Sequence, residues 1–335
     1  MGNLMKAVVT TTDKQTPLID KEIARPEVNG HDVLVKIAAS SMNPVDVKQL
    51  EVAQATQQER VLGFDAVGEI VAIGADVTDY QIGDRVFFAG ELGRTGSNAE
   101  FEAVNEALIA KAPTTLSDIE AAALPLTFLT AYEMLADKFG IQMVADGAKG
   151  KTLLIINGAG GVGSIMIQLA KWLGMTVIAT ASRDETIAWV NDMGADEVVN
   201  HRENYVEAIK SLGYDEVPYI AVLHSLEQHF ESAAALIGTF GHIGAIVQSM
   251  NPLPVGLIKN QAASLDWEFM FAKTNAGQNI ASQGTALELL TGLVNDGFVK
   301  STVTQTVDGL SAQTIADAQK EVSQGSMLGK LVIKY

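Results

Sequence analysis

Short apolar runs alternate with glycine, proline and aspartate over the first 126 residues of the chain. Turn signals such as Asn29-Gly30 and Gly83-Asp84 separate the runs. Evenly spaced short strands with turn signals predict a small, partly open β-barrel. The polar stretch from Glu51 to Arg60 is expected to form an exposed loop or a short helix. The predicted strands are Lys6–Thr10, Val33–Ile37, Val67–Ala72 and Arg85–Phe88.

Residues 151–272 alternate strand-like apolar runs with helical patterns. The run Lys151–Asn157 leads into Gly158–Gly163, and an amphipathic helix is predicted from Ser164 to Leu173 with Gly174 at its C-terminal end. Six strands joined by short crossovers predict an α/β fold with a doubly wound parallel sheet. The other five strands are expected at Met175–Thr180, Glu197–Asn200, Tyr219–Leu223, His242–Val247 and Ser264–Phe271.

A domain junction is expected near Pro125, which interrupts a helical pattern between Leu116 and Lys138. A chain of 335 residues is too long for one ordinary core and suits two domains. The tail, 273–335, is expected to fold back onto the first domain. It has helical patterns near Thr285–Asn295 and Thr314–Ser323, and strands are predicted near Thr302–Val307 and at Lys330–Lys334. The predicted domains are therefore 1–126 with 273–335, and 127–272.

The glycine-rich turn that follows Lys151–Asn157 predicts a dinucleotide site. Gly158 is expected to permit a tight turn, Gly160 to let backbone N–H groups approach a pyrophosphate, and Gly163 to let the helix pack closely on the strand. The helix N-terminus then favours the anion. A purely structural glycine turn is the alternative, since the chain has 30 glycines. The predicted contacts are Gly158, Ala159, Gly160, Gly161, Val162 and Gly163.

The composition excludes several functional classes. A net charge of −17 argues against nucleic acids and anionic membranes as main partners. The absence of cysteine removes disulfides, thiolate nucleophiles and cysteine-containing zinc sites. The N-terminus lacks the pattern of a signal peptide, and no apolar run reaches the roughly 18 residues of a membrane span. A cytoplasmic protein is expected.

The end of the second strand of the doubly wound sheet indicates which cofactor is bound. NAD enzymes place an acidic residue there to hold the ribose 2′-OH, whereas this strand ends in Thr180-Ala181-Ser182-Arg183. Arg183 can pair with a 2′-phosphate and Ser182 can donate to it, so NADP(H) is predicted. Two alternatives remain. Ser182 and Glu185 have the spacing of a capping box, and Asp184 favours NAD unless it lies in the first turn of the helix.

Seven segments are distinctive when taken in order: Ser41–Lys48, Leu62–Glu69, Gly83–Val86, Gly96–Phe101, Ala121–Thr127, Gly158–Gly163 and Trp267–Phe271. Together they resemble the medium-chain dehydrogenase/reductase superfamily, on its zinc-free quinone-oxidoreductase side and near the branch of zinc-type alcohol dehydrogenase-like proteins. The resemblance covers nearly the whole chain. It implies a GroES-like catalytic domain plus a Rossmann domain, with the active site in the cleft between them.

The zinc ligands of that superfamily are not matched in this sequence. Its zinc enzymes hold the catalytic ion with Cys, His and Cys or Asp, and the matching positions here are Asn43, Phe64 and Leu126. An amide, a phenyl ring and an isobutyl group cannot replace that set. The cysteine-rich structural zinc lobe is missing too, and the other histidines are not suitably spaced. No metal site is expected.

The resemblance also implies contacts with the cofactor. Thr130 matches a residue near the nicotinamide and phosphates, Lys330 matches a basic residue on the pyrophosphate, and His201 stands where relatives have a tyrosine near the 2′-phosphate. Ser225 and Val247, at the ends of the fourth and fifth strands, are expected to line the ribose and nicotinamide. The first three also have ordinary explanations, as helix-groove, solvent and surface residues respectively.

Without a Lewis acid, oxidation of a simple alcohol loses its main means of stabilising an alkoxide. A conjugated carbonyl accepts hydride more easily, because the charge spreads to its oxygen. Asn43, backed by Asp46, is expected to polarise that oxygen, with Lys48 and Tyr132 as weaker candidates, although Asn43-Pro44 is otherwise a turn signal. The prediction is a zinc-independent, NADPH-dependent oxidoreductase acting on quinones or α,β-unsaturated carbonyls. The alternatives are an alcohol or aldehyde dehydrogenase-reductase and a non-catalytic NADPH-binding protein.

A homodimer is expected through the edge strand Ser264–Phe271, because relatives commonly pair this strand edge to edge. Its alternate residues Leu265, Trp267, Phe269 and Phe271 could support that contact, or could be internal core. The physiological substrate does not follow from the sequence, because the loops near 48–60, 91–97 and 273–283 shape the site.

Overall fold

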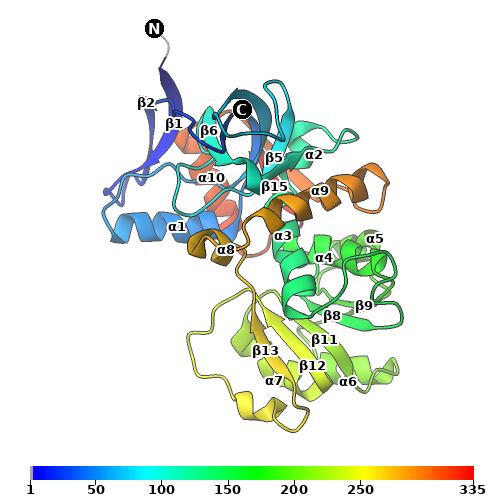
Figure 1. Cartoon of the computed structure of the whole chain (residues 1–335). Coiled ribbons are helices and arrows are strands. Elements are labelled where there is room, and N and C mark those ends of the chain that lie inside the picture. The colour runs from blue at the N-terminus through cyan, green and yellow to red at the C-terminus, as the bar shows by residue number, and fades with distance from the viewer. Residues whose placement is uncertain (1–2) are drawn as a thin grey trace. The chain divides into compact units, whose positions relative to one another are not determined.

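The computed structural model describes residues 3–335 and divides into two compact units (Figure 1). Unit 1 contains the chain up to Leu126 together with Phe271–Tyr335, and unit 2 is Thr127–Met270. The tail therefore belongs with the N-terminal residues, and the second boundary lies two residues before the predicted 272.

Unit 1 is built on a partly open β-barrel. Its strands are β1 (Leu4–Thr10), β2 (Leu18–Ala24), β3 (Asp32–Ser41), β4 (Asp65–Ile73), β5 (Arg85–Phe88), β6 (Phe101–Asn105), β7 (Ile109–Lys111), β14 (Val303–Asp308) and β15 (Lys330–Lys334). The main sheet has the order β14-β15-β3-β4-β5-β7, with β6 also paired to β3, and β1 and β2 form a separate hairpin. Because β14 and β7 have no neighbour on their outer sides in this order, the barrel does not close.

Helices cover the barrel, and α1 (Pro44–Ala55) starts at a residue type that caps helices. Asn43 is the N-cap of α1 and Pro44 its first residue, so the Asn43-Pro44 pair is a helix start rather than a turn. The first half of the stretch Glu51–Arg60 belongs to α1. The helices of this unit are α1 (Pro44–Ala55), α2 (Asp118–Ala122), α8 (Phe271–Ala276), α9 (Ala281–Asn295) and α10 (Ala312–Ser323), with a 3-10 turn at Glu106–Leu108.

Unit 2 is a doubly wound sheet. Its strands are β8 (Thr152–Ile156), β9 (Thr176–Thr180), β10 (Glu197–Val199), β11 (Val217–Val222), β12 (Ile237–Ala245) and β13 (Ser264–Trp267). They are all parallel, in the order β10-β9-β8-β11-β12-β13. This is the Rossmann strand order. Successive strands are added outward on one side of β8 and then, from β11 on, on the other side, and sheets of this kind bind ligands at the carboxyl ends of their strands near that point. The predicted fold class is confirmed.

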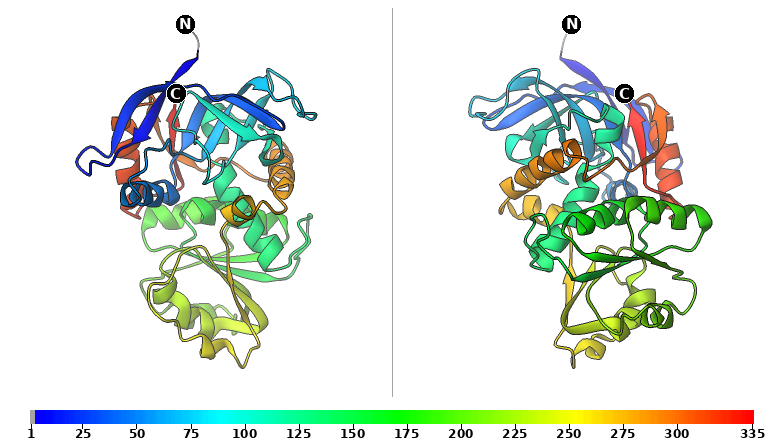
Figure 2. Two further views of the ribbon diagram at one scale, coloured as in Figure 1. Left: turned by 60° about the vertical axis from the view of Figure 1, so that its left-hand side comes forward. Right: turned by 90° about the vertical axis from the view of Figure 1, so that its right-hand side faces the viewer.

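Helices lie on both faces of this sheet (Figure 2). They are α3 (Pro125–Glu133), which continues as a π-helical turn at Met134–Lys138, α4 (Gly161–Trp172), α5 (Asp184–Met193), α6 (Tyr205–Ser211) and α7 (Leu226–Leu236), with a 3-10 turn at Val255–Ile258. The central strands β8 and β11 are mostly apolar because both of their faces are covered. Leu154, Ile220 and Phe230 are among the fully buried residues of the core.

The last strand of the sheet is shorter than predicted. β13 ends at Trp267, and Phe271 instead begins α8 of unit 1, where its ring packs against Phe64 with the centroids 4.9 Å apart. Trp267 and Phe269 are 47% and 51% exposed, whereas Phe271 is 2% exposed. The apolar alternation runs past the point where the chain passes from one unit to the other, so periodicity alone could not locate the end of the strand.

One helical stretch, Asp118–Lys138, is long and apolar enough to cross a membrane by length and composition. Of its most apolar window, 78% is buried inside the protein. Such burial is typical of a core helix, so the stretch is weak evidence for a membrane span.

Candidate functional site

The glycine-rich turn of unit 2 lies between β8 and the N-terminus of α4. Gly160 is the N-cap of α4, with φ −74° and ψ 173°. A Cβ atom on Gly163 would lie 2.5 Å from the carbonyl oxygen of Gly158 and 2.7 Å from its Cα, so no side chain fits there. This is the close helix–strand packing expected of Gly163.

The left-handed residue of this turn is Asn157, with φ 70°, and not a glycine. A Cβ on Gly158 would lie 3.0 Å from the Cβ of Ala179, so Gly158 lets β8 and β9 pack and is not the residue that makes the turn tight. A Cβ on Gly160 would have no atom closer than Asn157 Nδ2, at 3.5 Å. Two glycines therefore serve packing, and Gly160 leaves its backbone open to a ligand.

Polar groups gather at the carboxyl ends of β9 and β10. Thr180 Oγ1 accepts a hydrogen bond of 2.9 Å from the backbone N–H of Asn157 and lies 3.1 Å from Nδ1 of His201. Burial lowers the pKa of His201, and the positive charges of Arg202, His224 and Arg183 lower it further. Several basic groups therefore surround one place on the ligand-binding edge of the sheet.

Arg183 lies at this edge as the N-cap of α5. Its backbone N–H donates to Thr186 Oγ1 at 3.1 Å, so the alternative capping box of Ser182 and Glu185 does not form, because the helix starts one residue later. The guanidinium is about one-third exposed and pairs with Glu185 at 2.8 Å. Asp184 lies in the first turn of α5, past the end of β9. This is the position in which Asp184 does not favour NAD.

The other predicted cofactor residues are placed as follows. Thr130 and Tyr132 lie on α3, with Thr130 buried and the Tyr132 ring 5.7 Å from that of Phe128. Ser225 is the left-handed N-cap of α7, and Val247 follows β12 and packs on the core. Their contacts with a cofactor stay predictions.

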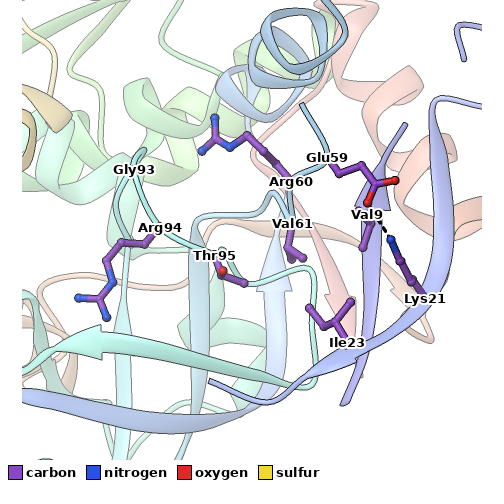
Figure 3. A pocket seen from close by; sticks show the side chains of 9 residues that line it. All are labelled: Val9, Lys21, Ile23, Glu59, Arg60, Val61, Gly93, Arg94 and Thr95. Carbon is purple, nitrogen blue, oxygen red and sulfur yellow. Dashed lines mark hydrogen bonds and ion pairs between the residues drawn. The ribbon is translucent and has the colours of Figure 1, made fainter. Parts of the chain in front are cut away.

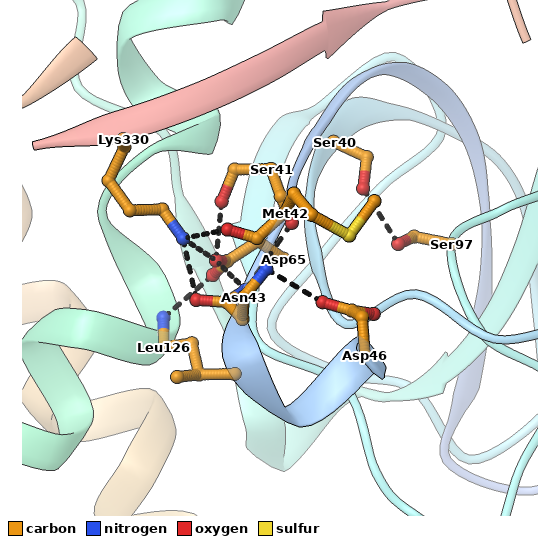
Figure 4. A network of polar contacts seen from close by, with 9 residues as sticks. All are labelled: Ser40, Ser41, Met42, Asn43, Asp46, Asp65, Ser97, Leu126 and Lys330. Atoms are coloured by element: carbon orange, nitrogen blue, oxygen red, sulfur yellow. Dashed lines mark hydrogen bonds and ion pairs between the residues drawn. The ribbon is translucent and has the colours of Figure 1, made fainter. Parts of the chain in front are cut away.

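In unit 1, Asn43 and Leu126, two of the three residues at zinc-ligand positions, contact a buried ion pair (Figure 4). Asp65 Oδ2 accepts hydrogen bonds from Ser41 Oγ at 2.6 Å and from Asn43 Nδ2 at 2.8 Å, and lies 3.5 Å from Lys330 Nζ. Its Oδ1 accepts from the Leu126 backbone N–H at 2.7 Å. The Asp65 and Lys330 side chains are 0% and 2% exposed. Charges buried to this extent need such partners to offset their desolvation.

The ammonium of Lys330 has an oxygen for each of its three N–H donors. Besides Asp65, it donates to the Met42 carbonyl at 2.8 Å and to Asn43 Oδ1 at 2.5 Å. No donor remains for a phosphate, so this arrangement differs from the pyrophosphate contact expected of Lys330. The cause is the pairing of β15 with β3, which brings Lys330 beside the Ser41–Asn43 segment.

Both N–H donors of the Asn43 amide are also occupied. Its Nδ2 donates to Asp65 Oδ2 at 2.8 Å and to the Ser41 carbonyl at 3.3 Å, and an amide has two N–H donors. In this arrangement Asn43 therefore has no free N–H donor with which to polarise a substrate oxygen, the role that was expected of it. Asn43 instead bridges Lys330 and Asp65.

Asp46 completes the network. Its Oδ2 accepts the backbone N–H of Asn43 at 2.8 Å, and its Oδ1 has no partner within residues 3–335. Burial raises the pKa of Asp46 to about 7; the Asn43 hydrogen bond and the Lys330 charge oppose this, while Asp65 adds to it. Burial also lowers the pKa of Lys330, against the pull of both carboxylates. The network thus holds an ion pair beside a carboxyl group whose protonated form is favoured by burial.

We expect Asp46→Asn to stabilise unit 1 at pH 8 by on the order of 1–3 kcal/mol, and by much less at pH 5. Because its pKa is raised on folding from a usual value of about 4, Asp46 contributes its full stability below about pH 4 and loses it as the pH rises through 7. Asparagine stays neutral and still accepts the Asn43 N–H. Urea unfolding at both pH values measures the difference, with exposed Asp308→Asn as the control. A stabilisation that is equal at both pH values would contradict the raised pKa of Asp46.

A metal ion does not fit these residues. The Phe64 ring packs at a tilt against that of Phe271, and the backbone N–H of Leu126 donates to Asp65, so neither side chain offers a metal ligand. No group of three or more His, Cys, Asp or Glu side chains that could hold an ion occurs within residues 3–335. A divalent cation would also have to displace the Lys330 ammonium that already balances Asp65. We therefore derive no step through a metal.

Known families and proteins match both units. Residues 29–114 match the alcohol dehydrogenase GroES-like domain, and residues 161–264 match the zinc-binding dehydrogenase family. A zinc-type alcohol dehydrogenase-like protein of Staphylococcus epidermidis is 42% identical over 309 residues, which is 92% of each chain. The chain belongs to the medium-chain dehydrogenase/reductase superfamily. The glycine turn at the start of α4 fits the nicotinamide cofactor of this superfamily, whereas the network around Lys330 does not fit the zinc in the names of its relatives.

Two further members of the superfamily are informative. A solved structure of a Rhizobium etli protein of the zinc-dependent alcohol dehydrogenase type has a TM-score of 0.92 and 35% identity, covering 99% of this chain and 98% of that one. An NADPH-dependent alkenal/one oxidoreductase of Arabidopsis thaliana is 34% identical over 199 residues, which is 56% of this chain and 50% of that protein.

Sequence reasoning gave no role to Asp65, Thr180 or His224. Asp65 had a visible signal, because an acidic residue stands beside Phe64 at the start of an apolar run. Thr180 ends β9 and His224 follows β11, and polar residues that contact a ligand are expected at these ends of a parallel sheet.

Proposed function

We propose that this member of the superfamily is a zinc-independent, NADPH-dependent reductase of quinones or α,β-unsaturated carbonyls. The observation that carries the proposal is the buried ion pair of Lys330 and Asp65, which also binds two of the residues at zinc-ligand positions, Asn43 and Leu126. A site organised around an internal ammonium offers no Lewis acid to stabilise an alkoxide. Acceptors that are already polarised do not need one.

Reduction of a conjugated carbonyl suits these residues. NADPH held at the glycine turn Gly158–Gly163 would supply a hydride for the β-carbon, and the π electrons would then move onto the carbonyl oxygen. A proton from solvent then reaches the α-carbon. The protein has to bind and orient the reactants, and in unit 1 the ion pair fixes the start of α1 and the adjoining Ser41–Asn43 segment.

The Arabidopsis relative supports both parts of the proposal, since its name combines NADPH with alkenals and alkenones. An alcohol or aldehyde reductase is the second candidate, favoured by the names of the staphylococcal and rhizobial relatives.

Loss of NADPH absorbance in a stopped-flow instrument separates these candidates. Three substrates are compared: a small quinone, an enal, and the saturated aldehyde of the same length. The proposal expects turnover with the quinone or the enal, and at least about 100-fold lower kcat/KM with the saturated aldehyde. Preference for the saturated aldehyde would favour the second candidate. Binding of NADPH without turnover of any substrate would leave a non-catalytic binding protein.

The choice of NADPH rests on the basic groups beside Arg183. We expect Arg183→Ala to weaken NADPH binding about 10- to 100-fold and to leave NADH binding nearly unchanged, because only NADPH has the 2′-phosphate that a guanidinium can pair with. Energy transfer from tryptophan to the reduced cofactor measures both affinities. Exposed Lys259→Ala removes an equal charge elsewhere in unit 2 and serves as the control. Equal loss for NADH and NADPH would count against the 2′-phosphate assignment.

We also propose a homodimer that pairs β13 with its copy. β13 is an edge strand, and Phe240, Trp267 and Phe269 of unit 2 are 75%, 47% and 51% exposed. We expect Trp267→Lys to shift the protein from dimer to monomer in light scattering, because a charge on an exposed edge opposes strand pairing. Phe298→Lys, at a 54% exposed site in unit 1, is the matched control. A monomeric wild type, or a dimer that tolerates Trp267→Lys, would exclude this interface.

A further inference from the structure

A cavity of about 340 Å³ lies in unit 1 between the β1-β2 hairpin and two loop segments (Figure 3). Three cationic side chains and one carboxylate line it, whereas the whole chain has 40 acidic and 23 basic residues. The cavity wall therefore has a net positive charge, whereas the whole chain has a net negative charge. The lining residues are Val9, Lys21, Ile23, Glu59, Arg60, Val61, Gly93, Arg94 and Thr95.

Two of the three cations are already neutralised. Lys21 Nζ lies 2.7 Å from Glu59 Oε2. Arg94 donates to both carboxylate oxygens of Asp32, at 2.9 and 2.7 Å. Figure 3 shows the Arg94 and Arg60 side chains pointing in different directions. The one uncompensated cation on the wall is Arg60.

Arg60 has no ion-pair partner within residues 3–335. Its guanidinium donates to Gln49 Oε1 at 3.3 Å and to the Leu92 carbonyl, which are both neutral acceptors. Two hydrogen bonds of 2.8 Å join the backbone of Arg60 to Thr10. The Arg60 N–H donates to Thr10 Oγ1, and the Thr10 N–H donates to the Arg60 carbonyl. A guanidinium has five N–H donors, so three remain unused. A fixed guanidinium with spare donors and an unbalanced charge is pre-organised for an oxyanion.

We propose that this cavity is a binding site for a small organic monocarboxylate, with Arg60 as the residue that pairs with the carboxylate. The side chains of Val9, Ile23 and Val61 supply an apolar wall for the body of the ligand. Because Lys21 and Glu59 balance each other, Arg60 leaves one net positive charge on the wall, which matches a ligand with a single negative charge. The proposal does not depend on reductase activity, because it concerns binding to unit 1.

Isothermal titration calorimetry of the full chain without cofactor tests the site, with hexanoate as probe and hexanamide as its neutral analogue. We expect hexanoate to bind at least about tenfold more tightly, because only the carboxylate makes charge-assisted hydrogen bonds. Arg60→Gln should remove this preference, while Lys36→Gln, which removes an equal charge at an exposed position on β3, should keep it. Hexanoate that binds no better than hexanamide, or that binds Arg60→Gln as well as wild type, overturns the proposal.

Two further measurements keep the test decisive. Arg60 also ties Leu92 to α1 through Gln49, so circular dichroism and thermal unfolding are recorded for each variant. If Arg60→Gln does not fold, Arg60→Lys replaces it, and we expect weakened but measurable hexanoate binding. Inorganic phosphate is the third probe. Phosphate that binds as tightly as hexanoate would show that the apolar wall contributes nothing, and would overturn the assignment of an organic monocarboxylate.

Discussion

Replacing Lys330 with methionine is expected to lower the free energy of unfolding of unit 1 by about 3–5 kcal/mol near pH 7. Methionine is similar in length but removes the ammonium, so the Asp65 carboxylate, which is 0% exposed, loses its balancing charge. The Met42 carbonyl and Asn43 Oδ1 lose a donor at the same time. Urea unfolding followed by hydrogen exchange of β3 and β15 measures the loss. All three tryptophans lie in unit 2, so their fluorescence does not report on this unit.

The double variant Lys330→Met with Asp65→Asn is the control. Asparagine keeps an acceptor for Ser41 and the Asn43 amide but carries no charge, so we expect the double variant to regain more than half of the lost stability. If Lys330→Met alone lowers the free energy of unfolding by less than about 1 kcal/mol, the effect would be that of an exposed ion pair and would contradict a buried one.

Replacing Gly163 with valine is expected to weaken NADPH binding at least about 100-fold and to destabilise unit 2 by about 1–3 kcal/mol. Its Cβ would lie within 2.7 Å of three backbone atoms of Gly158, and backbone atoms cannot move aside as a flexible side chain can. The start of α4 would have to lift from β8, which displaces the N–H groups expected to bind the pyrophosphate. Energy transfer from Trp189 on α5 to NADPH reports the affinity.

Gly292→Ala provides the comparison for this variant. Gly292 lies inside α9, and a Cβ there would meet no atom within 4 Å. We expect this change to leave NADPH binding unaltered and to stabilise unit 1 by up to about 1 kcal/mol, because alanine favours a helix more than glycine does. If Gly163→Val binds NADPH as well as wild type, the turn is structural only.

Local patterns were sufficient for much of the fold. β5 and β15 begin and end where the sequence predicts, because turn residues or charged residues bracket their apolar runs. β13 was predicted too long, because the apolar alternation continues through Phe269 to Phe271 although the backbone leaves the sheet at Trp267. A pattern with period two records which side chains are apolar, but not which of two units they join.

The site could be predicted only where its requirements are local. The glycine turn was recognised because six consecutive residues carry it. The hydrogen bonds of Lys330 and Asn43 with Asp65 were not predicted, since Lys330 and Asp65 are 265 positions apart and meet only through the pairing of β15 with β3 and of β3 with β4. No local pattern shows that a lysine at the start of the last strand is buried.

The most direct test of hydride transfer without a metal is turnover after exhaustive chelation. NADPH-dependent reduction of an enal is measured before and after dialysis against a strong chelator, together with the zinc content of the same samples. We expect an unchanged kcat/KM and zinc far below one ion per chain in both samples. Activity that falls with the loss of stoichiometric zinc, and returns when zinc is added, would contradict it.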